Sequence, residues 1–484
     1  MKCRRVVGLR GAVALIAITS FEAAMQPALA TSLRESVENA VVTNPEIGEV
    51  RADRQAVDQE LRQARALYLP SIDLRAAAGP EYSNNPATRL NPDDGSASTL
   101  ARLESQLTLT QVLFDGFARE SELERQLARV DSASQRVQET AEFVGLDAVE
   151  AHLDVLRNQA IVTFAEANLE QHRIILGKVN RLVDQGVGSI ADVSQAQARF
   201  AAAETALARA NGDLRDAIAV YLAIVGIPPS DLEEPIPPEA ALPVGVEAAA
   251  DRAAVANPSV EIAAADVKAV QAQLKGARSG FYPRFNLELG TNANRNIDGI
   301  EGSEVDASAL VVMRYNLFRG GADVAREREA FARVKEAQAA LDRAQRQAER
   351  EARVSYNARL TARDRVRSLQ RAADAQLATR NAYSQQFDLG QRSLLDLLDA
   401  ENELFLARTT LTTAIYTEIF AVYRILAVVG DLLAELEVEP PKETIDIYRE
   451  PGEPIHEVYE PAPEAGLGAP DSASRASSAL RGKP

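Results

Sequence analysis

Residues 185–193 read Gln-Gly-Val-Gly-Ser-Ile-Ala-Asp-Val, and residues 389–397 read Leu-Gly-Gln-Arg-Ser-Leu-Leu-Asp-Leu. The two stretches carry glycine, serine and aspartate in the same order, and Gly186 lies 204 positions before Gly390. Both lie inside long runs of helix-forming residues, and glycine permits a tight reversal between two helices. Each stretch therefore predicts the turn of a helical hairpin.

The spacing of 204 residues belongs to a duplication that covers most of the chain. Leu-Phe-Asp-Gly at 113–116 matches Leu-Phe-Arg-Gly at 317–320 at this offset. Upstream, Asn-Pro at 44–45 matches Asn-Pro at 257–258 at an offset of 213, so an intervening loop is nine residues shorter in the second copy. Chance similarity between alanine-rich helices would not keep proline, glycine and aspartate in register over this length.

The duplication and the flanking composition predict five segments. Each repeat is expected to contain a helix, two strands and a long helical hairpin. The segments are a signal peptide at 1–30, a first repeat at 31–227, a linker at 228–250, a second repeat at 251–433, and an acidic, proline-rich, partly disordered periplasmic tail at 434–484.

The signal peptide is predicted from a basic start, an apolar run at 11–20 and the small-x-small pattern at 28–30. An uncleaved membrane anchor is the alternative, but the run is too short to span a bilayer. Cys3, the only cysteine, would leave with this segment, so we expect no disulfide and no thiol nucleophile.

The charge and hydropathy of the chain exclude some partners. The 484 residues carry a formal net charge of -17 and no basic tract, so nucleic acid is not an expected partner. No later stretch reaches about 18 unbroken apolar residues, so we expect no transmembrane helix. Any membrane crossing would then be made by strands.

Four segments alternate between apolar and polar residues, which predicts strands with one apolar face. They lie around 72–75 and 103–110 in the first copy, and around 285–289 and 305–314 in the second. A half-buried sheet of a soluble protein would show the same alternation. Four strands cannot close a membrane barrel alone, because the smallest barrels have about eight. Two or three chains would have to share a barrel, and the strands alone do not choose between these numbers.

The helical segments are too long for an ordinary globular domain. Residues 117–185 contain no proline and would form a helix about 100 Å long. Apolar residues recur every seven positions there, which indicates coiled-coil-like packing. The matching helix at 322–386 is richer in arginine. A soluble coiled-coil rod would fit the periodicity but would not need the signal peptide, the amphipathic strands or the duplication.

Residues from about 33 to 430 resemble the TolC-type outer-membrane efflux proteins in the duplicated Asn-Pro, the Leu-Phe-x-Gly motifs and the two turn motifs. The resemblance implies an α+β fold in which an outer-membrane β-barrel, built from four strands per protomer, continues as a long periplasmic α-helical barrel in a trimer. It implies a passive exit duct of a tripartite efflux or type I secretion system. The implied partners are a homotrimer, a periplasmic adaptor (membrane fusion) protein, an inner-membrane pump and outer-membrane lipid, without a cofactor or enzymatic activity.

The resemblance also implies residue roles at the periplasmic tip. Arg392 and Asp192 match the gate arginine and its aspartate partner, while Phe387 and Ala191 replace family residues that carry hydroxyls. The implied adaptor-docking residues lie on the turns: Gly186, Val187, Gly390 and Gln391.

Helical spacing alone places Asp396, Asp399 and Glu403 on one face, where three chains would form an acidic pore ring. A solvated acidic face is the alternative. An ordinary surface ion pair is the alternative for Arg392 and Asp192.

Enzyme motifs are lacking in the sequence. His152, His172 and His456 are the only histidines, and we find no Walker motif, nucleophile elbow or zinc spacing. Two other classes stay open: a periplasmic coiled-coil adaptor would have one hairpin with lipoyl-like domains, and a general diffusion porin would lack the long helices.

Overall fold

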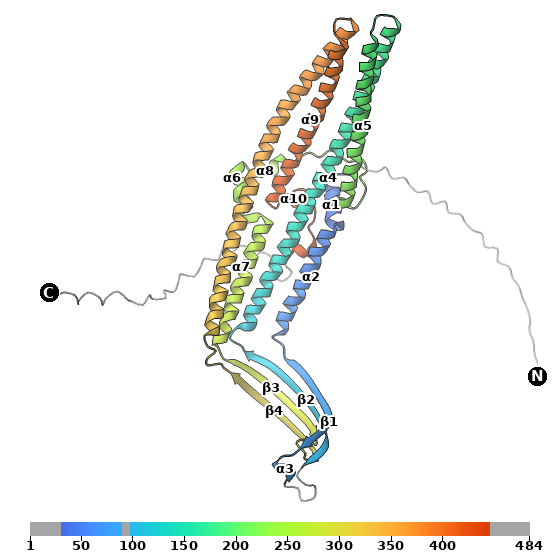
Figure 1. Ribbon diagram of the computed structural model, residues 1–484. Helices are drawn as coiled ribbons and strands as arrows, with labels where there is room; N and C mark the ends of the chain where they lie inside the picture. The colour runs from blue at the N-terminus through green and yellow to red at the C-terminus, as the bar shows by residue number, and fades with distance from the viewer. Residues whose placement is uncertain (1–30, 90–96, 446–484) are drawn as a thin grey trace, which may run out of the picture. The chain divides into compact units, whose positions relative to one another are not determined.

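The computed structural model describes residues 31–89 and 97–445 (Figure 1). The predicted signal peptide at 1–30 and the tail from residue 446 onward lie outside the described residues, and the five segment boundaries remain predictions. The elements, with η for 3₁₀ helices, are α1 (Leu33–Thr43), α2 (Pro45–Ala66), β1 (Ser71–Ser83), α3 (Pro86–Arg89), β2 (Ser98–Phe114), α4 (Ala118–Asp184), α5 (Ile190–Val225), η1 (Glu239–Ala241), α6 (Val246–Ala256), α7 (Pro258–Ala277), η2 (Arg278–Phe281), β3 (Arg284–Arg295), β4 (Ser303–Arg314), α8 (Ala322–Asp388), α9 (Leu394–Val428), α10 (Leu432–Glu435) and η3 (Lys442–Thr444).

The four strands form one antiparallel sheet in the order β1-β2-β3-β4. Leu74 lies opposite Leu107, and Leu287 lies opposite Val311. Because side chains alternate between the two faces of a strand, these registers place the predicted apolar residues of all four strands on the same face. No strand pairs with the outer edge of β1 or of β4 within the described chain.

The strand registers show that the two repeats are the same structural unit. The pair Ser71 and Thr110 in the first hairpin becomes Arg284 and Arg314 in the second when the offsets of 213 and 204 are applied. The same conversion gives every pair of the second hairpin, and only the last pair of the first hairpin, Ser83 with Ser98, has no counterpart. The offsets found in the sequence therefore describe a geometric repeat.

Helices α4 and α8 are the longest elements and contain 67 residues each. Near the sheet, α2 packs on α4, α4 on α7, and α7 on α8. Toward the turns, α4 packs on α5 and α8 on α9 (Figure 1). The heptad residues Val130, Val137, Val144 and Ala151 of α4 are all buried. They supply the apolar stripe that the sequence predicted.

The sequence did not predict helices α1 and α6, which precede the two Asn-Pro motifs. Helix α1 begins with a capping box in which Ser32 and Glu35 bond to each other's backbone N–H groups. Asn44 then ends α1 and caps α2, because its side chain accepts from the N–H of Glu46 at 2.9 Å. The Ser-x-x-Glu spacing was a readable signal for this helix start.

The main core lies midway along the long helices, where α1, α4, α9 and α10 meet. Helix α9 is long and apolar enough to cross a membrane, by length and composition alone. The sequence analysis expected no helix able to cross a membrane, so α9 differs from that expectation. However, Val422, Ile425 and Leu426 of α9 are buried in this core, which accounts for its apolarity.

A buried polar network ties the linker to the core. The His152 Nε2 lies 2.9 Å from the carbonyl oxygen of Glu233, and its Nδ1 lies 2.9 Å from the Ser36 hydroxyl. Because the carbonyl can only accept, Nε2 donates, and Nδ1 accepts from Ser36, which in turn accepts from Tyr221 at 2.9 Å. Burial lowers the pKa of His152 and so favours this neutral form.

Candidate functional site at the helix turns

The two predicted turns have the same geometry. Gly186 has φ +77° and Gly390 has φ +70°, a left-handed conformation that glycine adopts without strain. The N–H of Gly186 donates to Val183, and the N–H of Gly390 donates to Phe387, both at 2.9 Å. Each turn therefore closes the preceding helix in the same way and returns the chain antiparallel.

Serine side chains cap the returning helices. Ser189 and Asp192 form a capping box at the start of α5, so Asp192 bonds to the backbone of its own turn at 3.3 Å. The Ser189 hydroxyl also accepts from the N–H of Ala191 at 3.1 Å. Ser393 caps α9 by accepting from the N–H of Asp396 at 3.2 Å.

Apolar side chains are exposed around both turns. Val187 is 78% exposed, and Ile190 and Leu389, which the sequence did not single out, are 78% and 72% exposed. Gly186, Gly390 and Gln391 are exposed with them. These side chains add apolar area to the exposed surface of both turns.

A small apolar cluster holds the two hairpins together behind the turns. Ile175, Val179 and Ala196 of the first hairpin pack with Leu394, Leu397 and Leu398 of the second. Phe387 and Tyr383 pack against this cluster. The apolar surroundings of Phe387 explain why a ring without a hydroxyl fits there.

Two ion pairs bridge the hairpins beside this cluster, and the sequence predicted neither. Lys178 Nζ of α4 lies 2.7 Å from Asp388 Oδ1 at the end of α8. Arg199 of α5 lies 2.7 Å from Asp399 Oδ1 of α9. We call these two pairs the clasp, because they are the ionic contacts that join the hairpins close to the turns.

Arg392 does not contact Asp192 within the described chain. Its guanidinium stacks over the Tyr383 ring at 3.8 Å and lies 3.7 Å from Asp396, four residues along the same chain. The predicted pair of Arg392 with Asp192 would therefore have to form between neighbouring chains, and it remains a prediction.

The predicted acidic ring has arginine neighbours that lower its net charge. Asp399 is bound by Arg199, and Asp396 lies near Arg392. Glu403 is exposed and forms no ion pair in the part of the chain that the structure describes. Spacing along one helix could place the three carboxylates together, but it could not show that Arg199 reaches across from α5.

A layer of buried polar side chains lies between α4 and α9, further from the turns than the apolar cluster. Asn168 lines a small cavity with Glu401, which pairs with Arg380 at 3.3 Å, and His172 is buried one helical turn further along α4. Burial raises the pKa of Glu401, although Arg380 and Arg408 oppose this shift. Burial and the charge of Arg199 lower the pKa of His172. His172 is therefore a buried polar residue in the packing of the long helices.

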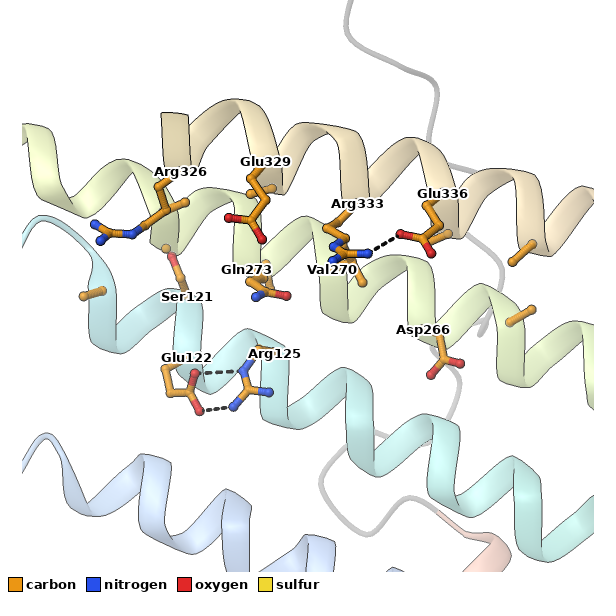
Figure 2. Close-up of a pocket in the computed structure, with 18 residues that line it drawn as sticks. Ser121, Glu122, Arg125, Asp266, Val270, Gln273, Arg326, Glu329, Arg333 and Glu336 are labelled. Atoms are coloured by element: carbon orange, nitrogen blue, oxygen red, sulfur yellow. Dashed lines mark hydrogen bonds and ion pairs between the residues drawn. The ribbon is translucent and has the colours of Figure 1, made fainter. Parts of the chain in front are cut away.

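A larger cavity, of about 800 Å³, lies where α4, α7 and α8 run alongside each other near the sheet (Figure 2). Four of its charged residues form pairs on their own helices: Arg125 with Glu122, and Arg333 with Glu336. No group of three potential metal ligands occurs among residues 31–89 and 97–445. The residue types there resemble a helix-packing surface more than a catalytic site.

The sheet carries the second functional surface. Ile72, Leu74, Val305, Val311 and Met313 are between 60% and 75% exposed on its apolar face. The opposite face carries polar and charged residues, including the ion pair of Arg314 with Glu288 at 3.0 Å. A sheet with one bare apolar face and one polar face matches a lipid-facing wall around an aqueous lumen. The fold therefore defines a membrane-embedded channel with helical extensions.

Comparison with known proteins identifies the family. The model of the outer membrane efflux protein family matches residues 37–226 and 249–430, so the chain belongs to this family. The outer membrane efflux protein BepC of Brucella suis is 25% identical over 417 residues, which cover 85% of this chain and 88% of BepC. The alkaline protease secretion protein AprF of Pseudomonas aeruginosa is 24% identical over 424 residues, which cover 86% of this chain and 87% of AprF.

The fold agrees with solved channels. The structure of the outer membrane protein VceC from Vibrio cholerae superposes with a TM-score of 0.69 at 18% identity, over 82% of this chain and 96% of VceC. The resemblance to TolC-type efflux proteins, the α+β fold and the location in the outer membrane are thereby confirmed. The protein is an outer-membrane exit duct.

Proposed function

We propose that three copies of this chain form a passive duct whose periplasmic tip is opened by an adaptor and an inner-membrane pump. The observation that carries the proposal is a four-stranded amphipathic sheet with two open edges, joined to the exposed turns by two 67-residue helices. Three chains would supply twelve strands, enough for a closed barrel.

The polar face of the sheet supports an aqueous path. In a barrel whose apolar face contacts lipid, residues such as Asp73, Gln106 and Glu288 would line the lumen. The long helices would continue this path into the periplasm. Transport would need no chemical step by the duct, because the pump would supply the energy.

The gate would lie at the turns. The side chain of Arg392 is 34% exposed, and its contact with Asp396 in its own chain is long, at 3.7 Å. The exposed part of the guanidinium supports a contact with Asp192 of a neighbouring chain. Asp396, Asp399 and Glu403 would add carboxylates at the same level, with Arg199 and Arg392 limiting their net charge.

The adaptor would bind the exposed turn residues Gly186, Val187, Gly390 and Gln391, with Ile190 and Leu389 adding apolar area. The relatives support two classes of cargo: BepC is named for efflux, and AprF for secretion of a protease. We therefore propose a tripartite efflux or type I secretion system as the setting.

Single-channel recording in planar bilayers tests the duct and its gate together. Purified protein should form trimers with small conductance, and Arg392→Ser should raise this conductance. Asp192→Ala should act in the same direction, and the double variant should add little, because both changes remove one interaction. Trimers whose conductance does not respond to either change would contradict the gate, and failure to form any channel would contradict the duct.

A further inference from the structure

The small cavity in the layer of buried polar side chains is built by both helical hairpins. Its volume is about 60 Å³, which is room for about two water-sized particles. Helix α4 contributes Asn168 and Gln171 to the wall, α8 contributes Arg380, and α9 contributes Glu401 and Arg408. The cavity therefore lies within one chain, between its first and second repeats.

The charged side chains around the cavity carry an excess of positive charge. Arg380 and Arg408 both act on Glu401, and the Nε of Arg380 lies 3.3 Å from Oε1 of this carboxylate. Arg408 forms no ion pair in the part of the chain that the structure describes, and its Cζ lies 5.9 Å from the centre of the Phe164 ring. Two guanidinium groups and one carboxylate give a net charge of +1 even when Glu401 is ionised. This balance favours an anion over a cation.

Polar atoms around the cavity also lack hydrogen-bond partners among the described residues. The Nε–H group of Arg380 has no acceptor with good geometry, and Asn168, which is only 8% exposed, has no partner for its Oδ1. Buried polar groups are normally hydrogen-bonded, so such exceptions indicate a missing water, ion or ligand. An amide can present either its oxygen or its NH₂ group after a half-turn of its last torsion, so Asn168 can donate to an anion.

We propose that this cavity binds one small monovalent anion, such as chloride, between Arg380 and Arg408. Guanidinium groups bind anions through charge-assisted N–H bonds, which are stronger than bonds between neutral groups. The rings of Phe164 and Phe405 line the same cavity and exclude water, so the electrostatic attraction is less screened there. Water alone would satisfy Asn168 but would leave one of the two guanidinium charges without a counter-ion.

The anion would join the two hairpins. Asn168 belongs to the first hairpin, whereas Arg380 and Arg408 belong to the second, so the contacts cross the same interface as the clasp. Asn168 lies ten residues before Lys178 on α4, which places the anion about 15 Å further from the turns than that clasp residue. All of these residues come from one chain, so the site does not depend on the proposed ring.

Glu401 couples anion binding to pH. Burial raises the pKa of Glu401, while Arg380 of α8 and Arg408 of α9 oppose this rise. Helix α4 presents two neutral amides to the cavity, and His172, one turn further along, is favoured in its neutral form because burial and Arg199 lower its pKa. A bound anion adds negative charge beside Glu401 and favours its protonated form. Anion affinity should therefore rise as pH falls through the pKa of Glu401.

Chloride titration of the full chain in detergent tests the site. The linewidth of the chloride resonance in NMR reports binding, and circular dichroism reports whether each variant keeps its helices. Arg380→Gln and Arg408→Gln should each weaken chloride binding by about tenfold or more, because each removes a charge-assisted hydrogen bond. Arg371→Gln is the matched control, since Arg371 is an exposed arginine of α8 that does not line the cavity, and it should bind chloride like the unmodified chain.

Two further measurements decide the outcome. The unmodified chain should bind chloride more tightly at pH 5 than at pH 8, and Glu401→Gln should remove this dependence; an unmodified chain whose affinity does not change with pH would overturn the role of Glu401. Crystals of the unmodified chain grown in bromide need no variant and should show anomalous density between Arg380 and Arg408. Water alone at that position, or chloride binding that the control weakens as much as the cavity variants do, would overturn the site.

Discussion

The clasp makes a quantitative prediction about opening. Replacing Asp388 and Asp399 by asparagine removes two charges while keeping the size of each side chain. The bonded side chains of Lys178 and Arg199 are 30% and 37% exposed, so solvent screens both pairs. Each such pair contributes about 0.5 kcal/mol. A trimer would have six of them, worth about 3 kcal/mol in favour of the closed tip, which corresponds to about a hundredfold in the equilibrium.

Bilayer conductance measures this effect directly. The double variant should spend far more time in open states than the unmodified duct at about 0.1 M salt. At about 1 M salt the difference should shrink, because the Debye length falls from about 10 Å to about 3 Å. Glu170→Gln is the matched control, since Glu170 pairs with Arg173 on the same helix and does not bridge the hairpins. If the double variant opens no more often than this control, the clasp does not hold the tip closed.

Three further predictions concern stability, docking and topology. Burial raises the pKa of Glu142 to about 7. The free energy of unfolding should therefore fall by up to about 3 kcal/mol as pH rises from about 4.5 to 7. Urea unfolding at pH 5 and pH 8 should show a smaller fall for Glu142→Gln than for the unmodified chain, and equal falls would contradict the shift. Gly186→Asn and Gly390→Asn should still form trimers but should abolish export. Asparagine tolerates the left-handed turn but adds a side chain to the proposed docking surface. Normal export by both variants would exclude that surface. If the loop between β3 and β4 faces outside the cell and the turn at Ser189 lies in the periplasm, an impermeant thiol reagent should label Glu301→Cys and spare Ser189→Cys in intact cells. The reverse pattern would refute this topology.

Local periodicity was sufficient for most of the fold. The period of two placed Leu74, Leu107, Leu287 and Val311 on one face, and the registers agree. The absence of proline gave the length of α4, and Gly186 marked its end. These features depend on patterns among residues close together in the chain, or on the duplication. A single sequence is enough to show both.

Contacts between the hairpins could not be read in this way. Arg199 and Asp399 are 200 positions apart, and their meeting depends on how α5 and α9 are rotated and shifted along their axes. A heptad pattern fixes which stripe of a helix is buried but not which residue it faces. The same limit hid the pair of Lys178 with Asp388 and the stacking of Arg392 on Tyr383.

The open edges of the sheet have a consequence for biogenesis. A lone chain leaving the periplasm would expose the hydrogen-bonding groups of β1 and β4 together with a bare apolar face, which is a template for aggregation. Helices α4 and α8 find their packing partners within one chain, whereas the outer edges of β1 and β4 gain pairing only from other chains. We expect newly made chains to pass through a stage with protected helices and protease-sensitive strands, and to insert only as they assemble. Pulse-labelled chains that become protease-resistant in the sheet before they trimerise would show the opposite order.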